Sequence, residues 1–220
     1  MTRTTSNSPR RRRRPDARPD EILDAALDIF SRDGFAAARV EDIAAAAGLS
    51  KGAVYLYFPS KEAMLNALVE RSAGTLARSA DAMVAAGAPD DPEGALRGLL
   101  RLLFGALADP KISAAPRLVL AEAGRFPEIA EYYRTHVLDI ARGAITALHS
   151  AGVEAGKFRA VDSDALMRLI AGPGLAHMAL TSIFAFPPAT LTEPEAMADA
   201  IADLLLEGLR PRPALNAGET

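Results

Sequence analysis

A stretch beginning at Ser50 combines small, cationic and aromatic side chains in a way that suits contact with a nucleic acid. Ser50 is a plausible N-cap, so we expect a short helix to begin directly after it. Lys51 and Tyr55 fall on that helix, from which several side chains face outward. Gly52 and Ala53 are small enough to let the helix lie deep in a major groove. We therefore expect this helix to read DNA.

A recognition helix needs a second helix and a tight turn to hold it, and the preceding residues supply both. A short apolar stripe beginning at Val40 stops at Gly48, which can adopt the left-handed conformation that the turn requires. Ala44 and Ala47 are small, so the two helices can cross closely. With a supporting helix at about 20–33, these elements form a helix-turn-helix.

Helical periodicity continues through the rest of the chain, without a strand pattern or an internal repeat. The class is therefore all-α, with about nine helices. After the helix-turn-helix, the expected helices cover about 60–86, 93–108, 115–124, 127–150, 162–184 and 193–209. Gly172-Pro173-Gly174 should kink or break the helix that contains it.

Composition argues against catalysis. The 220-residue chain has no cysteine, three histidines and a net charge of −3. His136 and His149 would lie about 220° apart on one helix and could not share a ligand. No zinc-protease, phosphate-loop or nucleophile-elbow motif occurs. We expect no enzyme activity, no cofactor and no metal. The lack of a signal peptide or a membrane-length apolar run predicts a cytoplasmic protein without membrane contact.

The N-terminal residues 1–18 are expected to form a disordered basic arm, because they contain the run Arg10–Arg14 and little to bury. The arginines could follow the DNA and enter its minor groove. The alternative is a solvated tail with generic affinity for polyanions. In both cases the run should steepen the salt dependence of DNA binding.

The region 40–65 resembles the DNA-binding domain of TetR-family regulators. The shared residues are VEDIA at 40–44, AGLSKG at 47–52 and YLYFPSKEAML at 55–65, and the last of these is the most specific. The strong resemblance covers about residues 20–70, whereas the remainder is similar only in length and helical content. It implies a DNA-binding domain at 19–65, a ligand-binding and dimerisation domain at 66–210 and a tail at 211–220.

The resemblance also implies which residues contact DNA: Arg39, Ser50, Lys51, Gly52, Ala53, Tyr55, Tyr57 and Lys61. Tyr55 and Tyr57 would support the recognition helix and bond backbone phosphates, and Lys61 would contact a phosphate. Arg39 departs from the family pattern, which usually has a threonine that caps the second helix and touches a phosphate. Arginine can bind a phosphate but is a poor cap.

The last two expected helices are apolar on more than one face, whereas a surface helix needs only one apolar stripe. We expect the additional face to meet the same helices of a second copy, as the family resemblance also implies. The predicted interface residues are Leu166, Ile170, Leu180, Ile201 and Leu205. The alternative is a helix pair buried entirely within one chain.

By analogy with the family, the middle helices would enclose a cavity for a small apolar effector. The candidate lining residues are Leu100, Phe104, Leu118, Tyr132, His136 and His177. Tyr132 and His136 share a helix face, although an ordinary surface or core histidine gives the same pattern. Arg97 and Arg101 could form a polar handle for the effector, or could simply extend along the surface.

These observations together predict a dimeric, sequence-specific transcription regulator. It would be a repressor that binds a palindromic operator and leaves it when a small molecule changes the spacing of its two DNA-binding heads. Two alternatives stay open: a non-specific DNA-binding protein, and a small-molecule-binding protein with a vestigial DNA-binding head.

Overall fold

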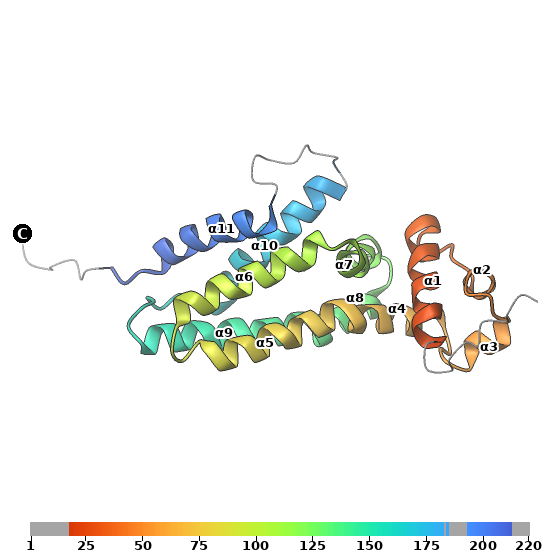
Figure 1. Cartoon of the computed structure of the whole chain (residues 1–220), viewed down its shortest axis with the longest axis horizontal. Helices are drawn as coiled ribbons and strands as arrows, with labels where there is room; N and C mark the ends of the chain where they lie inside the picture. The colour runs from red at the N-terminus through yellow and green to blue at the C-terminus, as the bar shows by residue number, and fades with distance from the viewer. Residues whose placement is uncertain (1–17, 183, 185–192, 213–220) are drawn as a thin grey trace, which may run out of the picture. The chain divides into compact units, whose positions relative to one another are not determined.

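The computed structural model of the chain describes residues 18–182, 184 and 193–212 (Figure 1). Every regular element within these ranges is helical, which confirms the all-α class. The chain divides into two compact units, one ending at Leu65 and the other beginning at Asn66. Arg10–Arg14, Ile183 and Pro187–Pro188 lie outside the described residues. None of the described helices has the length and hydropathy needed to cross a bilayer.

The first unit is built on a supporting helix and two shorter ones. Its elements are α1 (Arg18–Asp33), α2 (Val40–Ala46), α3 (Lys51–Tyr55) and the start of α4 (Lys61–Val69). α1 stops where Gly34 takes a φ of 79°, as its position in the sequence predicts. Phe30 and Phe35 close the core on either side of this glycine, with their rings edge to face and their centroids 5.2 Å apart.

The second unit contains the remaining helices. They are the end of α4, η2 (Glu70–Gly74), α5 (Thr75–Gly87), α6 (Pro92–Ala108), α7 (Pro110–Glu122), α8 (Pro127–Tyr133), η3 (Arg134–Leu138), α9 (Asp139–Glu154), α10 (Ser163–Ser182) and α11 (Pro194–Leu209). The elements η2 and η3 are single π-helical turns, so α4 to α5 and α8 to α9 each form one continuous helix. The described residues thus form nine helices, as expected.

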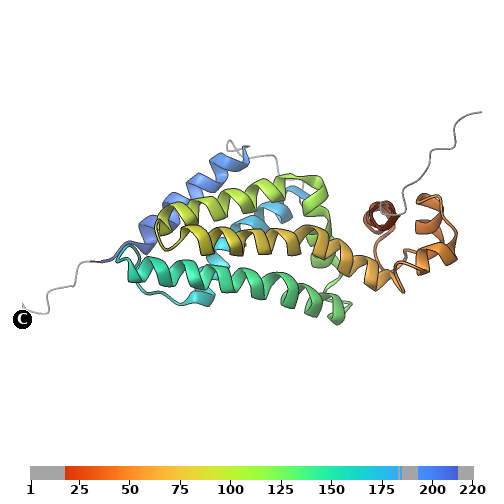
Figure 2. The same ribbon diagram turned by 60° about the horizontal axis from the view of Figure 1, so that its bottom comes forward.

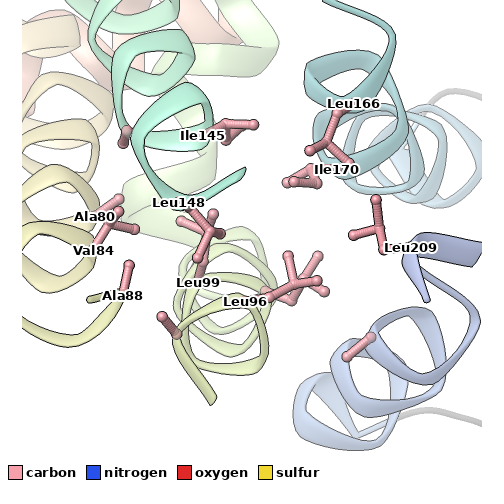
Figure 3. Close-up of a cluster of buried hydrophobic side chains, with 14 of the residues drawn as sticks. Ala80, Val84, Ala88, Leu96, Leu99, Ile145, Leu148, Leu166, Ile170 and Leu209 are labelled. Atoms are coloured by element: carbon pink, nitrogen blue, oxygen red, sulfur yellow. The ribbon is translucent and has the colours of Figure 1, made fainter. Parts of the chain in front are cut away.

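The core of the second unit lies between helices that are distant in sequence. α5, α6 and α9 pack side by side, and α11 packs along α6 (Figure 2). Figure 3 shows side chains from α6, α9, α10 and α11 meeting in one interior. Leu100 and Leu148 are among its fully buried members. These side chains remove apolar surface from water, which is the main force holding the helices together.

Two boundaries differ from those expected. α7 begins at Pro110 rather than near residue 115, because Asp109 ends α6 and also caps α7, where its side chain accepts a hydrogen bond from the Lys111 N–H at 2.8 Å. Proline at the first helical position has no N–H to leave unsatisfied. The sequence predicts a kink or a break at Gly172-Pro173-Gly174; α10 continues through Pro173, so the helix does not break there.

Candidate functional site

The turn between α2 and α3 has the geometry of a helix-turn-helix. Gly48 has a φ of 66°, a conformation that L side chains rarely adopt. The Leu49 N–H donates to the Ala44 carbonyl at 2.8 Å, which holds the turn against the end of α2. Ile43 and Val54 are fully buried where the two helices cross. The remaining side chains of α3 are consequently left toward solvent.

The start of α3 is fixed as the sequence predicts. The Ser50 Oγ accepts a hydrogen bond from the Ala53 N–H at 3.2 Å, which satisfies one of the unpaired N–H groups of the first turn. No atom outside the helix lies within 4 Å of the position that a Cβ on Gly52 would occupy. The first turn of α3 therefore presents a flat, open surface at which another molecule can approach the backbone.

Cationic and phenolic groups surround this open surface. Tyr55 and Tyr57 are 43% and 40% exposed, although both are large side chains. The Lys51 ammonium lies 5.7 Å from the centre of the Tyr55 ring and 2.6 Å from a Glu41 carboxylate oxygen. This hydrogen bond raises the pKa of Lys51 and lowers that of Glu41. Lys51 stays charged, and its exposed head is available to exchange Glu41 for a phosphate.

Arg39 stands at the N-cap of α2 and makes no side-chain cap hydrogen bond. Its guanidinium Nε lies 4.0 Å from a Glu41 carboxylate oxygen, and the side chain is largely exposed. This confirms the expectation that arginine would cap α2 poorly. It also leaves the guanidinium close to Glu41 and Lys51, at the N-terminal end of α2.

Lys61 is engaged within its own unit. Its ammonium donates to the Phe35 carbonyl at 2.8 Å and the Ala36 carbonyl at 3.0 Å, and lies 4.7 Å from the centre of the Phe35 ring. It thereby ties the start of α4 to the segment after α1. The third N–H of the ammonium is not used by either carbonyl, so phosphate contact stays a prediction, alongside a structural role that the sequence did not suggest.

The second unit contains a cavity of about 320 Å³, partly open to solvent, between α5, α6, α7, α8, α9 and α10. Alanine and leucine make up most of its wall, with isoleucine, valine, methionine, proline and one tyrosine, Tyr133, contributing the rest. Ala73 of η2 and Val137 of η3 lie in the same wall, so both π turns border the cavity. Its volume falls at the small end of the range, about 300–1,000 Å³, of small-molecule pockets.

The cavity is real but the six residues proposed for its lining are wrong. None of Leu100, Phe104, Leu118, Tyr132, His136 and His177 lines it. Their sequence neighbours do so instead: Leu99, Leu103, Val119, Tyr133, Val137 and Met178. The predicted positions lie one residue, or about 100°, around each helix. Leu100 and Phe104 are buried in the core, and Tyr132 stacks on His136 with ring centroids 3.9 Å apart.

The residues predicted at the dimer interface of α10 and α11 differ in their exposure. Leu166 and Ile170 are 3% and 2% exposed and belong to the protomer's own core, so they cannot form a free face. Leu180 is exposed as predicted, whereas Ile201 and Leu205 are partly buried against the core. Other large apolar side chains of α10 and α11 are open to solvent: Leu169, Leu175 and Leu204. The dimer contact itself stays a prediction.

Arg97 and Arg101 form ion pairs with α11, a role that the sequence did not suggest. Arg97 pairs with Asp203 at 2.5 Å and Arg101 pairs with Asp199 at 2.8 Å. Both carboxylates belong to α11, so the two arginines tie α6 to the last helix rather than entering the cavity. The hydrogen bond from Arg101 lowers the pKa of Asp199.

The same division into a helix-turn-helix unit and a helical cavity-bearing unit appears in known proteins. A family model for bacterial regulatory proteins of the tetR family matches residues 22–68, and a model for the tetracyclin repressor-like C-terminal domain matches residues 89–203. The chain belongs to the TetR family. Its helix-turn-helix is therefore of the type that the residues at 40–65 suggested.

The chain spans less than a third of the length of the first curated relatives that it matches. The HTH-type transcriptional regulator RutR of Escherichia coli strain K12 is 47% identical over 62 residues, which are 28% of this chain and 29% of RutR. EthR of Mycolicibacterium smegmatis is 29% identical over 170 residues, 73% of this chain and 76% of EthR. Among solved structures, the fatty acid degradation regulator FadR of Bacillus halodurans covers 92% of this chain and 100% of its own, with 26% identity and a TM-score of 0.69.

Proposed function

We propose that this TetR-family chain is a sequence-specific transcription regulator, a repressor that leaves its operator when a small apolar molecule occupies the second unit. The observation that carries the proposal is the start of α3, where a capped first turn exposes Gly52 beside Lys51 and Tyr55. The helix N-terminus and the lysine both favour an anion. A regulator of this kind acts in the cytoplasm, where the operator lies.

In the proposed complex α3 enters the major groove and the surrounding side chains bind the backbone. Gly52 and Ala53 allow close approach to the base edges, while Lys51, Tyr55 and Tyr57 contact phosphates, with Arg39 and Lys61 at the ends of the footprint. Phosphate contacts fix the register of the protein and base contacts supply the specificity.

Two protomers would bind a palindrome through successive major grooves, about 34–36 Å apart. The exposed leucines of α10 and α11 support a homodimer, because apolar side chains of this size are seldom left in water without a partner surface. We propose that Leu169, Leu180 and Leu204 lie in this interface.

The apolar cavity supports regulation by a small molecule. FadR of Bacillus halodurans is described as a fatty acid degradation regulator, which is compatible with an apolar effector for this chain as well. The effector must bind the operator-free conformation more tightly than the operator-bound one, since equal affinity for both would shift nothing.

Selection of bound fragments from random DNA tests the whole proposal. The expected result is one palindrome whose scrambling costs several kcal/mol. Gly52→Leu serves as the point variant, because the open space at Gly52 admits the side chain without disturbing the fold. It should abolish operator binding without lowering thermal stability, since replacing a helical glycine does not destabilise the helix where space is open. Recovery of unrelated sequences would indicate a non-specific DNA-binding protein, and recovery of none would indicate a vestigial head.

Arg10–Arg14 lies outside the described residues, so its role stays part of the proposal. Deleting residues 1–14 should weaken operator binding and flatten the dependence of log K on log salt. Each phosphate contact that the deletion removes means that fewer counterions are released from the DNA on binding. An unchanged slope in anisotropy titrations would exclude a role for the arm.

A further inference from the structure

The cavity wall carries a single polar side chain. Among the described residues that line it, all are aliphatic, proline or methionine except Tyr133, the last residue of α8. No lysine, arginine, histidine, aspartate or glutamate of the described ranges belongs to this wall. A ligand inside the cavity would therefore meet one hydroxyl group and otherwise only apolar surface.

The Tyr133 hydroxyl is available to such a ligand. It forms no hydrogen bond with any residue that the structure describes, whereas a tyrosine hydroxyl within a protein normally has a partner. Burial raises the pKa of Tyr133 to about 12, so the hydroxyl keeps its proton and can donate. The hydroxyl oxygen is not sealed from solvent, so a ligand oxygen that accepts from it would replace water at the cavity wall.

The charge of the ligand follows from the same wall. A carboxylate or phosphate transferred into the cavity would lose its hydration and find no cation there, a penalty that a single neutral hydroxyl does not offset. At about 320 Å³, the cavity lies at the small end of the range of small-molecule pockets. This is the size of a medium-chain alcohol.

We propose that the effector is an uncharged, medium-sized apolar molecule with one oxygen, which the Tyr133 hydroxyl binds. The proposal rests on the proposed function, in which this cavity is the effector site. Tyr133 acts as a specificity-determining residue: it distinguishes ligands by a hydrogen bond that an otherwise hydrocarbon wall cannot provide.

Decanol and decanoate test this assignment, since they share a chain length and differ in the charge of one end. Binding to the full-length chain is measured by calorimetry near neutral pH. Decanol should bind at least tenfold more tightly than decanoate. Tyr133→Phe should weaken decanol binding about five- to tenfold, as expected for the loss of one neutral hydrogen bond.

Tyr132→Phe is the matched control, because Tyr132 precedes Tyr133 on the same helix and stacks on His136 outside the cavity. It should leave decanol affinity unchanged. Decanoate binding as tight as decanol, undetectable decanol binding, or an equal affinity of Tyr133→Phe and wild type would each overturn the proposal.

A separate operator-release measurement keeps the two proposals distinguishable. If decanol binds through Tyr133 but leaves the operator complex intact, the regulatory function is contradicted and the ligand assignment is supported. If decanoate releases the operator and decanol does not bind, the ligand assignment is overturned and the regulatory function is supported.

Discussion

Arg39 is the residue at which the DNA-binding unit departs most from its family pattern. The structure leaves α2 without a side-chain cap at this position. Arg39→Thr should raise the free energy of unfolding by about 0.5–2 kcal/mol relative to Arg39→Ala, because a threonine hydroxyl can accept from the first turn. Urea denaturation of both variants measures the difference.

The same pair of variants separates capping from phosphate contact. Arg39→Ala removes the phosphate-binding group and should weaken binding to the operator and to scrambled DNA alike. Arg39→Thr supplies a hydroxyl that can both cap α2 and touch a phosphate, so it should lose less affinity and gain stability. Equal unfolding midpoints for the two variants would contradict the capping argument. Unchanged DNA affinity of Arg39→Ala would remove Arg39 from the proposed footprint.

Single residues at helix starts and turns were predictable, whereas the cavity wall was not. Ser50 caps its helix as expected, because its side-chain oxygen can accept a hydrogen bond from an unpaired N–H of the first turn. A leucine, in contrast, suits a core and an apolar cavity equally well. Periodicity identifies the apolar side of α6 but cannot divide it between Leu99, which lines the cavity, and Leu100, which is buried in the core.

At the scale of elements, the end of α9 depends on a glycine that touches an aromatic ring. A Cβ on Gly152 would overlap the ring of Phe158, which is buried. Gly152→Ala should therefore lower the free energy of unfolding by about 1–3 kcal/mol or more. Thermal or urea unfolding of the purified chain measures the loss.

Gly143 provides the control on the same helix. A Cβ there would meet nothing within 4 Å, so Gly143→Ala should stabilise the protein by about 0.5–1 kcal/mol through reduced backbone entropy of the unfolded chain. A neutral effect of Gly152→Ala would mean that Phe158 moves aside at little cost. Opposite signs for the two substitutions are the expected outcome.

The pairing of α6 with α11 has a pH dependence whose sign follows from Asp199. Arg101 lowers the pKa of this carboxyl in the folded state, so the pair stabilises folding above the unfolded pKa of about 3.9 and loses that effect as pH falls through the folded pKa. Asp199→Asn should thus be slightly less stable than wild type at neutral pH. The gap should close in more acidic buffer.

Urea midpoints of both proteins across this range measure the effect. The pair is exposed, so the effect should be small and should decrease with added salt. Asp81→Asn is the control, since Asp81 makes no ion pair with any described residue. A stability gap that persists at acidic pH would exclude the ion pair as its cause.

The two π turns, η2 and η3, are the features of the helices that the sequence did not predict. The sequence predicts continuous helices at 60–86 and 127–150, and the structure shows each with one wide turn. Side chains take up the backbone carbonyls there: Ser72 donates to Leu68 at 2.8 Å and Thr135 donates to Glu131 at 3.0 Å. Serine and threonine occur in many ordinary helices, so neither residue identifies a π turn in advance.

For the whole molecule, the fold was predictable because glycine, proline and aspartate residues mark where helices begin and end. The dimer interface was less predictable, because it depends on which apolar side chains stay on the surface of the folded protomer. Leu204 illustrates this: it is a large apolar side chain of α11, and the structure leaves it 76% exposed. If α10 and α11 meet a second copy, Leu204→Glu should convert the dimer to a monomer, because it places a charge in the apolar contact. Analytical ultracentrifugation measures the change in mass.

Loss of the dimer should also change DNA binding, and this change distinguishes a defect in assembly from a defect in folding. A dimer binds both halves of a palindrome at once, so loss of dimerisation should reduce operator affinity on the order of a hundredfold while binding to a single half-site is retained. Val153→Glu, an exposed apolar position on α9 rather than α10 or α11, should leave both mass and affinity unchanged. A Leu204→Glu protein that remains dimeric would move the interface away from α11. A monomer with full operator affinity would show that the two DNA-binding heads act independently.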